Sequence, residues 1–387
     1  MSEAVIVAYG RSPIGRAGKG SLVEVRPDDL AAQVTNKVLQ KVPQLARATI
    51  DDLMCGCGLP AGEQGFNLGR VVSILTRLDV PGTTVNRYCA SSLQTSRMAF
   101  HAIKAGEGDA FISIGVECVS RYVNGFADQP DAQNPRLKRG NTEEYPDIYI
   151  AMGETAENVA DLKQITREEM DRYAVKSQTR AVQSRDGGFF DREIIPVPLP
   201  NGTTMSRDDG PRPNTTMEVL ATLKPVFREN GRVTAGNSCP LNDGAAAVVI
   251  TSDRRAKDLG IRPLARIVAT GVSALEPEIM GLGPIEASRQ ALKRAGMSID
   301  DVDIVEINEA FAAQVIPSAR ELGIDPFSDK LNPHGGSIAL GHPFGMTGAR
   351  ILCTLLNGLI TEDKTIGLET MCVGGGQGMA MIVERLN

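Results

Sequence analysis

Short apolar runs and amphipathic segments alternate along the whole chain. Runs rich in apolar and β-branched residues predict strands at Ala4–Ala8, Asp109–Glu117, Ala245–Thr251, Ala265–Thr270, Asp303–Ile307, Thr365–Thr370 and Met379–Glu384. Apolar residues at helical spacing predict helices over Asp28–Val42, Leu93–Ala105, Arg167–Ser184, Ile285–Ala295, Phe311–Leu322 and Gly348–Leu359. Strands that alternate with helices are typical of βα units, so we expect an α/β protein with a largely parallel sheet.

A short segment recurs in the second half of the chain. Thr49–Leu53 (TIDDL) and Ser298–Val302 (SIDDV) each follow a predicted helix and precede a strand-like run. This recurrence predicts that the chain has two similar halves. The stretch between them is richer in Asn, Asp, Pro and Arg, which is typical of an insertion with long loops. The predicted parts are a first core half at 1–120 plus about 241–262, a loop domain at 121–240, and a second core half at 263–387.

Composition narrows the classes of function. The net charge of −6 gives no support to nucleic-acid binding, which needs a basic face. No run of about 18 apolar residues is evident, so no membrane span is expected. Seven cysteines are an odd number in a long chain, which favours reduced thiols and a cytoplasmic protein over a disulfide framework. Only His101, His334 and His342 can supply an imidazole.

One cysteine stands where a strand gives way to a helix. In Thr83–Gln94 a β-prone stretch ends, and a helix with small residues begins at or near Cys89. Free N–H groups at a helix start favour an anion, so the pKa of the Cys89 thiol is expected to fall below its usual value of about 8.5. The segment therefore predicts a nucleophile, while a small buried apolar residue is the alternative.

Three further segments carry polar groups among tight turns. His342 lies between Gly341 and Pro343 in a glycine-dense stretch, which suits either a fixed general base or a simple helix cap. Cys372 opens a glycine loop that could present backbone N–H groups to an oxyanion, or could be an inert thiol in a hairpin. Asn308 follows a strand and could cap the next helix or hold a water or carbonyl.

Together these segments resemble the thiolase family. The motifs NRYCASSLQ, NEAFA, GGSIALGHPFGMTGAR and CVGGGQG occur here in the family's order and at its spacing, as do VTAGN with NDGAAA, MGETAENVA and MGLGP. The resemblance covers essentially the whole chain. It implies two similar βαβαβαββ halves in a five-layer αβαβα core with an inserted loop domain. It also implies a homodimer or homotetramer, with a tetramer contact near Asn124–Asp147, and a possible hydratase/dehydrogenase partner.

The resemblance also implies a reaction, the cleavage of a 3-ketoacyl-CoA by coenzyme A to acetyl-CoA and a shortened acyl-CoA. Cys89 would take up the acyl group, and His342 would accept its proton and form an oxyanion site with Asn308 and a water. Cys372 would be the acid and base, and the N–H groups of Cys89 and Gly374 would form a second oxyanion hole. Coenzyme A is a substrate, with no permanently bound cofactor and no metal.

Position within the family motifs assigns ligand contacts as well. Contacts to coenzyme A are expected from Arg212, Phe227, Ala235, Cys239, Ala310 and Phe311. Met152 and Met280 would line the acyl or pantetheine region, where flexible thioethers suit varied chains, with plain core packing as the alternative.

The chain departs from the family pattern in places that bear on the substrate. Cys239 and Pro240 replace the usual Ser and Gly, and Ala151 stands where acetoacetyl-type members often carry His. The second difference favours a degradative 3-ketoacyl-CoA thiolase in fatty-acid or related lipid degradation. The alternatives are an acetoacetyl-CoA thiolase, a carrier-loaded ketosynthase, a sterol-carrier-type thiolase or a non-catalytic coenzyme A-binding subunit.

Overall fold

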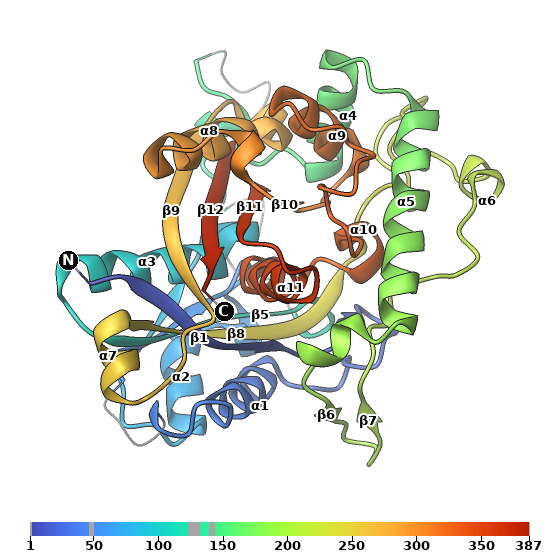
Figure 1. Cartoon of the computed structure of the whole chain (residues 1–387). Helices are drawn as coiled ribbons and strands as arrows, with labels where there is room; N and C mark the ends of the chain where they lie inside the picture. Colours follow the sequence, from blue (N-terminus) through green and yellow to red (C-terminus); the bar gives the residue numbers. More distant parts are fainter. Residues whose placement is uncertain (1, 46–49, 123–131, 139–143, 387) are drawn as a thin grey trace.

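Two groups of strands with the same arrangement form the framework of the protein (Figure 1). The computed structural model describes residues 2–45, 50–122, 132–138 and 144–386. The first group has the order β4 (Gly82–Val85), β3 (Asp52–Gly56), β5 (Ala110–Cys118), β8 (Asn242–Ser252) and β1 (Ala4–Arg11). The second has the order β10 (Ile304–Ile307), β11 (Ile366–Val373), β12 (Gln377–Arg385) and β9 (Ala265–Ala274). Two residue pairs between β1 and β9 join the groups into one sheet.

The sheet is mixed, so the expectation of a largely parallel sheet is wrong. Among the named strands of the described residues, β4–β3–β5 and β10–β11 pair in parallel, and the other strand pairs are antiparallel. One cause is the glycine turn between β11 and β12, where Gly375 and Gly376 have φ of +75° and +79°. Such a turn closes a hairpin, and a hairpin makes its strands antiparallel.

The two groups are structural repeats of each other. Leu331 forms a parallel bridge with Val305 at the edge of β10, where β4 lies at the edge of β3. Asp51, just before β3, accepts the two backbone N–H groups that begin β5, at 2.7 and 2.9 Å. Asp303, just before β10, does the same at the start of β11, at 3.0 and 2.8 Å. The predicted duplication is confirmed, but the counterpart of Asp51 is Asp303 and not Asp300.

Helices and strands alternate in five layers (Figure 1). Helices α1 (Pro27–Leu39) and α2 (Leu68–Leu75) cover the outer face of the first strand group, α3 (Ser91–Ala105) and α11 (Thr347–Thr361) lie between the groups, and α8 (Gly283–Ala295) and α9 (Ala312–Glu321) cover the second. Three clusters of buried apolar side chains fill the interfaces: one on the outer side of each strand group, and one that surrounds α3 and α11 and reaches both groups. This is the predicted five-layer α/β core.

The remaining elements lie mainly in the connecting regions. They are the helices α4 (Met152–Leu162), α5 (Arg167–Asp186), α6 (Met217–Ala221), α7 (Asp253–Asp258) and α10 (Ser337–Leu340), and the short strands β2 (Gly15–Arg16), β6 (Val197–Pro198) and β7 (Thr204–Met205). Much of the predicted tetramer contact at Asn124–Asp147 lies outside the described residues. The predicted domain boundaries stay a prediction.

Helix α11 is unusually apolar because it is enclosed by the core. The window Phe344–Thr361 has a mean hydropathy of 1.2 and is long enough to span a membrane by length and composition alone. The window is not an unbroken apolar run, because it contains Arg350 and Asn357. Inside the fold, however, 83% of the window Phe344–Thr361 is buried, as expected for the central helix of a layered protein.

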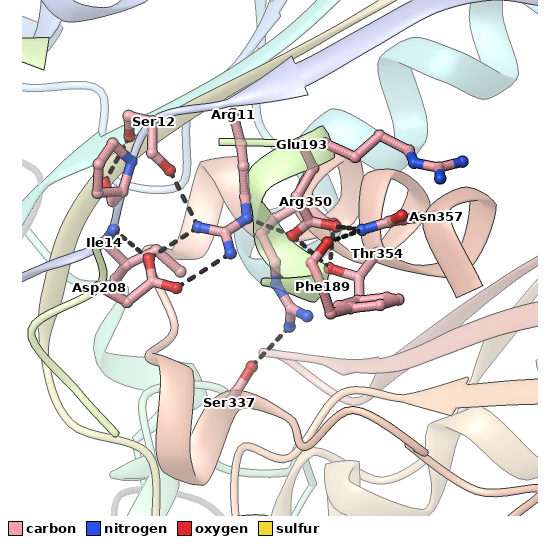
Figure 2. A network of polar contacts seen from close by, with 12 residues as sticks. Arg11, Ser12, Ile14, Phe189, Glu193, Asp208, Ser337, Arg350, Thr354 and Asn357 are labelled. Carbon is pink, nitrogen blue, oxygen red and sulfur yellow. Dashed lines mark hydrogen bonds and ion pairs between the residues drawn. The ribbon is translucent and has the colours of Figure 1, made fainter. Parts of the chain in front are cut away.

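A buried ionic network joins β1 to the connecting region and to α11 (Figure 2). Arg11, which is fully buried, contacts Glu193 through Nε at 2.6 Å and Asp208 through Nη1 and Nη2 at 2.7 and 3.0 Å. Thr354 and Asn357 of α11 donate to the Glu193 carboxylate at 3.1 and 3.2 Å. Because both carboxylates are satisfied by buried donors, the network fixes the connecting region against the core.

Candidate active site

Cys89 lies on a strained turn between β4 and α3. The 3-10 turn Tyr88–Ala90 leads directly into α3 at Ser91, as the sequence predicted. Tyr88 has φ of +44°, which is uncommon for a residue with a side chain. The Asn86 side chain accepts the Tyr88 N–H at 2.7 Å, and the Ser91 hydroxyl donates to the Tyr88 carbonyl at 2.6 Å. These bonds hold the strained turn that presents Cys89.

The surroundings of Cys89 raise the pKa of its thiol instead of lowering it. Burial raises that pKa to about 12, while hydrogen bonding from the backbone N–H groups of Gly374 and of Cys89 itself acts in the opposite direction. The expected decrease is therefore wrong: the low dielectric of the site outweighs the few N–H groups at the helix start. Formation of the thiolate at neutral pH requires a base that accepts the proton.

His342 is a buried imidazole whose orientation is set by its neighbours. Its backbone N–H donates to the Asn242 side chain at 2.9 Å. Its Nδ1 lies 2.7 Å from the Thr347 hydroxyl, which donates its own hydrogen to the Pro343 carbonyl at 2.7 Å. The hydroxyl oxygen therefore accepts from Nδ1–H, and this tautomer leaves Nε2 without a proton.

The charge state of His342 agrees with that tautomer. Burial lowers the pKa of the imidazole to about 3, and the positive charge of Arg350 acts in the same direction. The ring is neutral near pH 7, so Nε2 carries no proton and can accept one. No side chain caps α11, whose N-cap is Met346, so His342 is not a simple helix cap.

The Asn308 side chain faces the unprotonated Nε2 of His342. Its Nδ2 lies 3.3 Å from Nε2, and its Oδ1 accepts from the Ser337 hydroxyl at 2.6 Å. The alternative role of Asn308 as a helix cap is wrong, because the N-cap of α9 is Phe311 and no side chain caps that helix. Asn308 and His342 are therefore in contact, and the oxyanion site that they would form with a water stays a prediction.

Cys372 lies at the end of β11, just before the glycine turn. It is fully buried, and burial raises the pKa of its thiol well above the usual value. Negative charge on Cys89 or on Cys239 would raise that pKa further. The turn that carries Cys89 also packs against β11, so the thiols of Cys89, Cys239 and Cys372 belong to one region, which we call the thiol cluster.

A cavity of about 260 Å³ opens onto Cys89. It is lined by Gly58, Leu59, Tyr88, Cys89, Gln133, Ile148, Tyr149, Ile150, Met152, Phe344, Gly374 and Gly375. The ring of Phe344 packs edge-on against the His342 ring at 5.1 Å, which places the imidazole behind this wall. Among the described residues, this lining has no Lys, Arg or His. We call this space the acyl cavity.

A second cavity, of about 650 Å³, contains most of the residues assigned to coenzyme A. Arg212, Phe227, Ala235 and Cys239 line it. Ala310 and Phe311 are buried and absent from the lining, although the Ala310 carbonyl accepts the Cys239 N–H at 3.0 Å and the rings of Phe311 and Phe227 meet edge-on at 6.1 Å.

The two methionines assigned to the acyl or pantetheine region occupy different surroundings. Met152 lines the acyl cavity, whereas Met280 is buried in the core and lines neither of these cavities, which favours its packing alternative.

Sequence reasoning missed Glu117, a buried carboxylate beside the site. It accepts the backbone N–H groups of Gly58 and Gly345, each at 2.8 Å, and that of Leu59 at 3.2 Å. Glu117 thereby ties the loop after β3 to the loop that carries His342. A carboxylate at the end of the apolar run of β5 was the available signal. The cavity residues Ile148 and Tyr149 were also missed, since no local motif marks them, and Phe344 was given no role although it lies within the motif GGSIALGHPFGMTGAR.

Comparisons with known proteins agree with this fold. The model of the thiolase N-terminal domain matches residues 4–254, and that of the thiolase C-terminal domain matches residues 261–385. The crystal structure of the Bacillus anthracis acetyl-CoA acetyltransferase is 37% identical, with a TM-score of 0.91, and the match covers 100% of this chain and 99% of that one.

Two curated relatives are similar over nearly their whole length. A 3-oxoadipyl-CoA/3-oxo-5,6-dehydrosuberyl-CoA thiolase of Escherichia coli is 44% identical over 100% of both chains. A 3-ketoacyl-CoA thiolase of Bacillus subtilis is 41% identical over 99% of this chain and 100% of its own. The fold and these matches define an acyltransferase. Within that class, the chain belongs to the thiolase family.

Proposed function

We propose that the protein cleaves 3-ketoacyl-CoA with coenzyme A, giving acetyl-CoA and an acyl-CoA shortened by two carbons, through an acyl group on Cys89. The observation that carries this proposal is the position of Cys89 in the wall of an apolar cavity, with Gly374 beside it and His342 behind Phe344. A thioester-forming nucleophile needs this combination of a thiol, N–H donors and a base.

In the first step His342 accepts the Cys89 proton. The thiol has a raised pKa, so it attacks the ketone carbonyl only if a base removes its hydrogen. The unprotonated Nε2 of His342 is suited to that role, because Nδ1–H is held by Thr347. The charged imidazole and Asn308 then stabilise the oxygen that becomes negative in the reaction.

Cleavage of the carbon–carbon bond leaves the acetyl-CoA enolate, which must be protonated. Cys372 is a protonated thiol in the same cluster, since burial raises its pKa, and it can donate this proton. The N–H groups of Cys89 and Gly374 stabilise the oxyanion when coenzyme A attacks the acyl-Cys89 thioester. The second cavity, with Arg212 in its wall, holds coenzyme A, since guanidinium groups pair well with phosphates.

The acyl cavity favours an uncharged acyl chain. A buried carboxylate needs a cationic partner or several hydrogen-bond donors, and the described lining contains no Lys, Arg or His. Its walls are built largely from apolar side chains such as Ile148, Ile150 and Phe344. These features favour the degradation of ordinary fatty acyl chains over the dicarboxylic substrate in the name of the Escherichia coli relative.

A panel of substrates tests this proposal. Thiolysis followed by loss of 3-ketoacyl-CoA absorbance is expected for acetoacetyl-CoA and for 3-ketohexanoyl- and 3-ketooctanoyl-CoA. The value of kcat/KM for 3-oxoadipyl-CoA should be at least about tenfold lower than for 3-ketohexanoyl-CoA, since a carboxylate would enter the cavity unpaired. Equal values would contradict the charge argument, and no thiolysis of any substrate would contradict the proposed reaction.

We also propose that the protein is a homodimer that pairs through the edge of β4. This strand has one neighbour, β3, and its residues are partly exposed. Large apolar side chains are exposed nearby, with Phe66 at 101%, Ile74 at 59% and Leu75 at 41%. An edge strand beside exposed apolar groups is typical of an interface. A tetramer, a hydratase/dehydrogenase partner and a cytoplasmic location stay predictions.

Light scattering tests the assembly. The wild-type mass should be twice that of the 41.3 kDa chain. The double variant Phe66→Asp with Ile74→Asp should shift the protein toward one chain at micromolar concentration, because it places charges in the apolar interface. Leu162→Asp is the control, since Leu162 is 57% exposed at the end of α4. A wild-type mass of one chain would refute the proposal.

A further inference from the structure

A line of hydrogen bonds runs from the buried Arg350 to the proposed base. Arg350 Nη2 donates to the Ser337 hydroxyl at 3.0 Å, a contact seen in Figure 2. Ser337 donates to Asn308 Oδ1 at 2.6 Å, and Asn308 Nδ2 lies 3.3 Å from His342 Nε2. His342 Nδ1 continues the line to Thr347, which ends it at the Pro343 carbonyl.

The groups at the two ends of the line determine the direction, from donor to acceptor, of every hydrogen bond in it. A guanidinium can only donate hydrogen bonds, and a carbonyl can only accept them. Ser337 has a single hydrogen, so a hydroxyl that accepts from Arg350 gives its hydrogen to Asn308. The Asn308 amide is then oriented with Oδ1 toward Ser337 and its NH₂ group toward His342. Each link fixes the next, because a reversed amide or tautomer would set two donors or two acceptors against each other.

We propose that Arg350 and Ser337 are positioning residues for catalysis, which fix the amide of Asn308 and thereby keep Nε2 of His342 as the acceptor. This inference rests on the proposed roles of Asn308 and His342. Neither Arg350 nor Ser337 is among the residues that line the acyl cavity or the coenzyme A cavity. They act on the reaction through Asn308 alone.

The charge of Arg350 acts on two buried carboxyl groups of the second strand group. Glu306 of β10 and Glu369 of β11 lie directly opposite each other in the parallel register. Both are fully buried, and the charge of Arg350 acts on each of them. Arg350 Nε and Nη1 have no hydrogen-bond partner among the described residues. The Nη2 group is therefore the part of the guanidinium whose hydrogen bond begins the line.

Removal of the Ser337 hydroxyl breaks this line of hydrogen bonds between Arg350 and Asn308. Without it, Asn308 Oδ1 loses the donor that fixes the amide, and the amide can turn its oxygen toward His342. An oxygen at Nε2 favours the tautomer with a hydrogen on that nitrogen, and such an imidazole cannot accept the Cys89 proton. Substrate binding is unaffected because the cavity walls are unchanged.

The test is Ser337→Ala, a change that removes one oxygen from a buried residue of α10. We expect kcat of thiolysis to fall about tenfold, with KM within about twofold of the wild-type value, since a single hydrogen bond is lost. Ser318→Ala is the matched control: Ser318 is also a fully buried helical serine, and its hydroxyl donates to the Gly281 carbonyl at 3.3 Å. The control should retain the wild-type kcat.

A double-mutant cycle separates positioning from general damage to the site. Asn308→Ala alone should lower kcat about a hundredfold. Because Ser337 acts through Asn308, Ser337→Ala should cause no further loss in the Asn308→Ala background. Wild-type kcat in Ser337→Ala, or a full tenfold further loss in the double variant, would overturn the inference. Wild-type kcat in Asn308→Ala would contradict the proposed active site instead.

Discussion

Replacing Cys89 by alanine is expected to lower kcat of thiolysis by a factor on the order of 10⁴ or more, which is the range seen when a nucleophile is removed. The loss should be this large because no other described thiol can replace it. Cys372 lies in the same cluster, but it is not among the residues that line the acyl cavity, and Cys239 lines the other cavity. Cys89 lines the acyl cavity.

Mass spectrometry shows whether the lost step is acyl transfer. Incubation with 3-ketohexanoyl-CoA, without free coenzyme A, should add a butanoyl group to the wild-type chain and none to Cys89→Ala. Cys353→Ala is the control, since Cys353 is buried in α11 among core residues and lines neither cavity. An acylated Cys89→Ala chain, or one that retains wild-type kcat, would assign the nucleophile elsewhere.

The largest loss of stability is expected from Arg11→Met. The variant leaves Glu193 and Asp208 buried without their cation, and breaking a buried ion pair in this way typically costs about 3–5 kcal/mol. The apolar stem of Met fills much of the space of Arg, so the loss comes mainly from the two carboxylates. Because Glu193 also holds Thr354 and Asn357 of α11, the disturbance reaches the central layer of the fold.

Urea unfolding followed by circular dichroism measures this loss. The midpoint should fall strongly for Arg11→Met. For the control Arg254→Ala the free energy of unfolding should change by no more than about 1 kcal/mol, because the ion pair of Arg254 with Asp109 is at the surface. Similar midpoints for the two variants would show that the buried network contributes no more than a surface ion pair.

The sequence predicted the elements of this fold better than their pairing. The predicted helices Asp28–Val42, Leu93–Ala105 and Gly348–Leu359 correspond to α1, α3 and α11, because amphipathic spacing is a local property. The relative direction of two paired strands is not a local property of the sequence. Periodicity in β11 and β12 reads the same for either direction, and only the closing of the Gly374–Gly376 turn decides between a hairpin and a crossover.

The features of the candidate site also divide into those that a local pattern predicts and those that depend on distant segments. Cys89, His342, Cys372 and Asn308 lie in motifs that can be read along the chain, and the structure brings His342 and Asn308 into contact. The direction of the Cys89 pKa shift depends on how completely distant elements enclose the thiol, which no local pattern records. Glu117, Tyr149 and Phe344 were missed for the same reason, since their contacts join segments far apart in sequence.

The repeat within the fold has a consequence for how such a site can arise. The connection from β4 to α3 carries Cys89, and its counterpart, from Leu331 to α11, carries His342. The helices that follow these connections pack against each other between the sheets, so the two copies of one loop meet at the centre of the molecule. A duplicated ancestor would have had the same residues at both places. With the roles proposed for Cys89 and His342, the attacking group and its base stand on equivalent loops of one repeated scaffold.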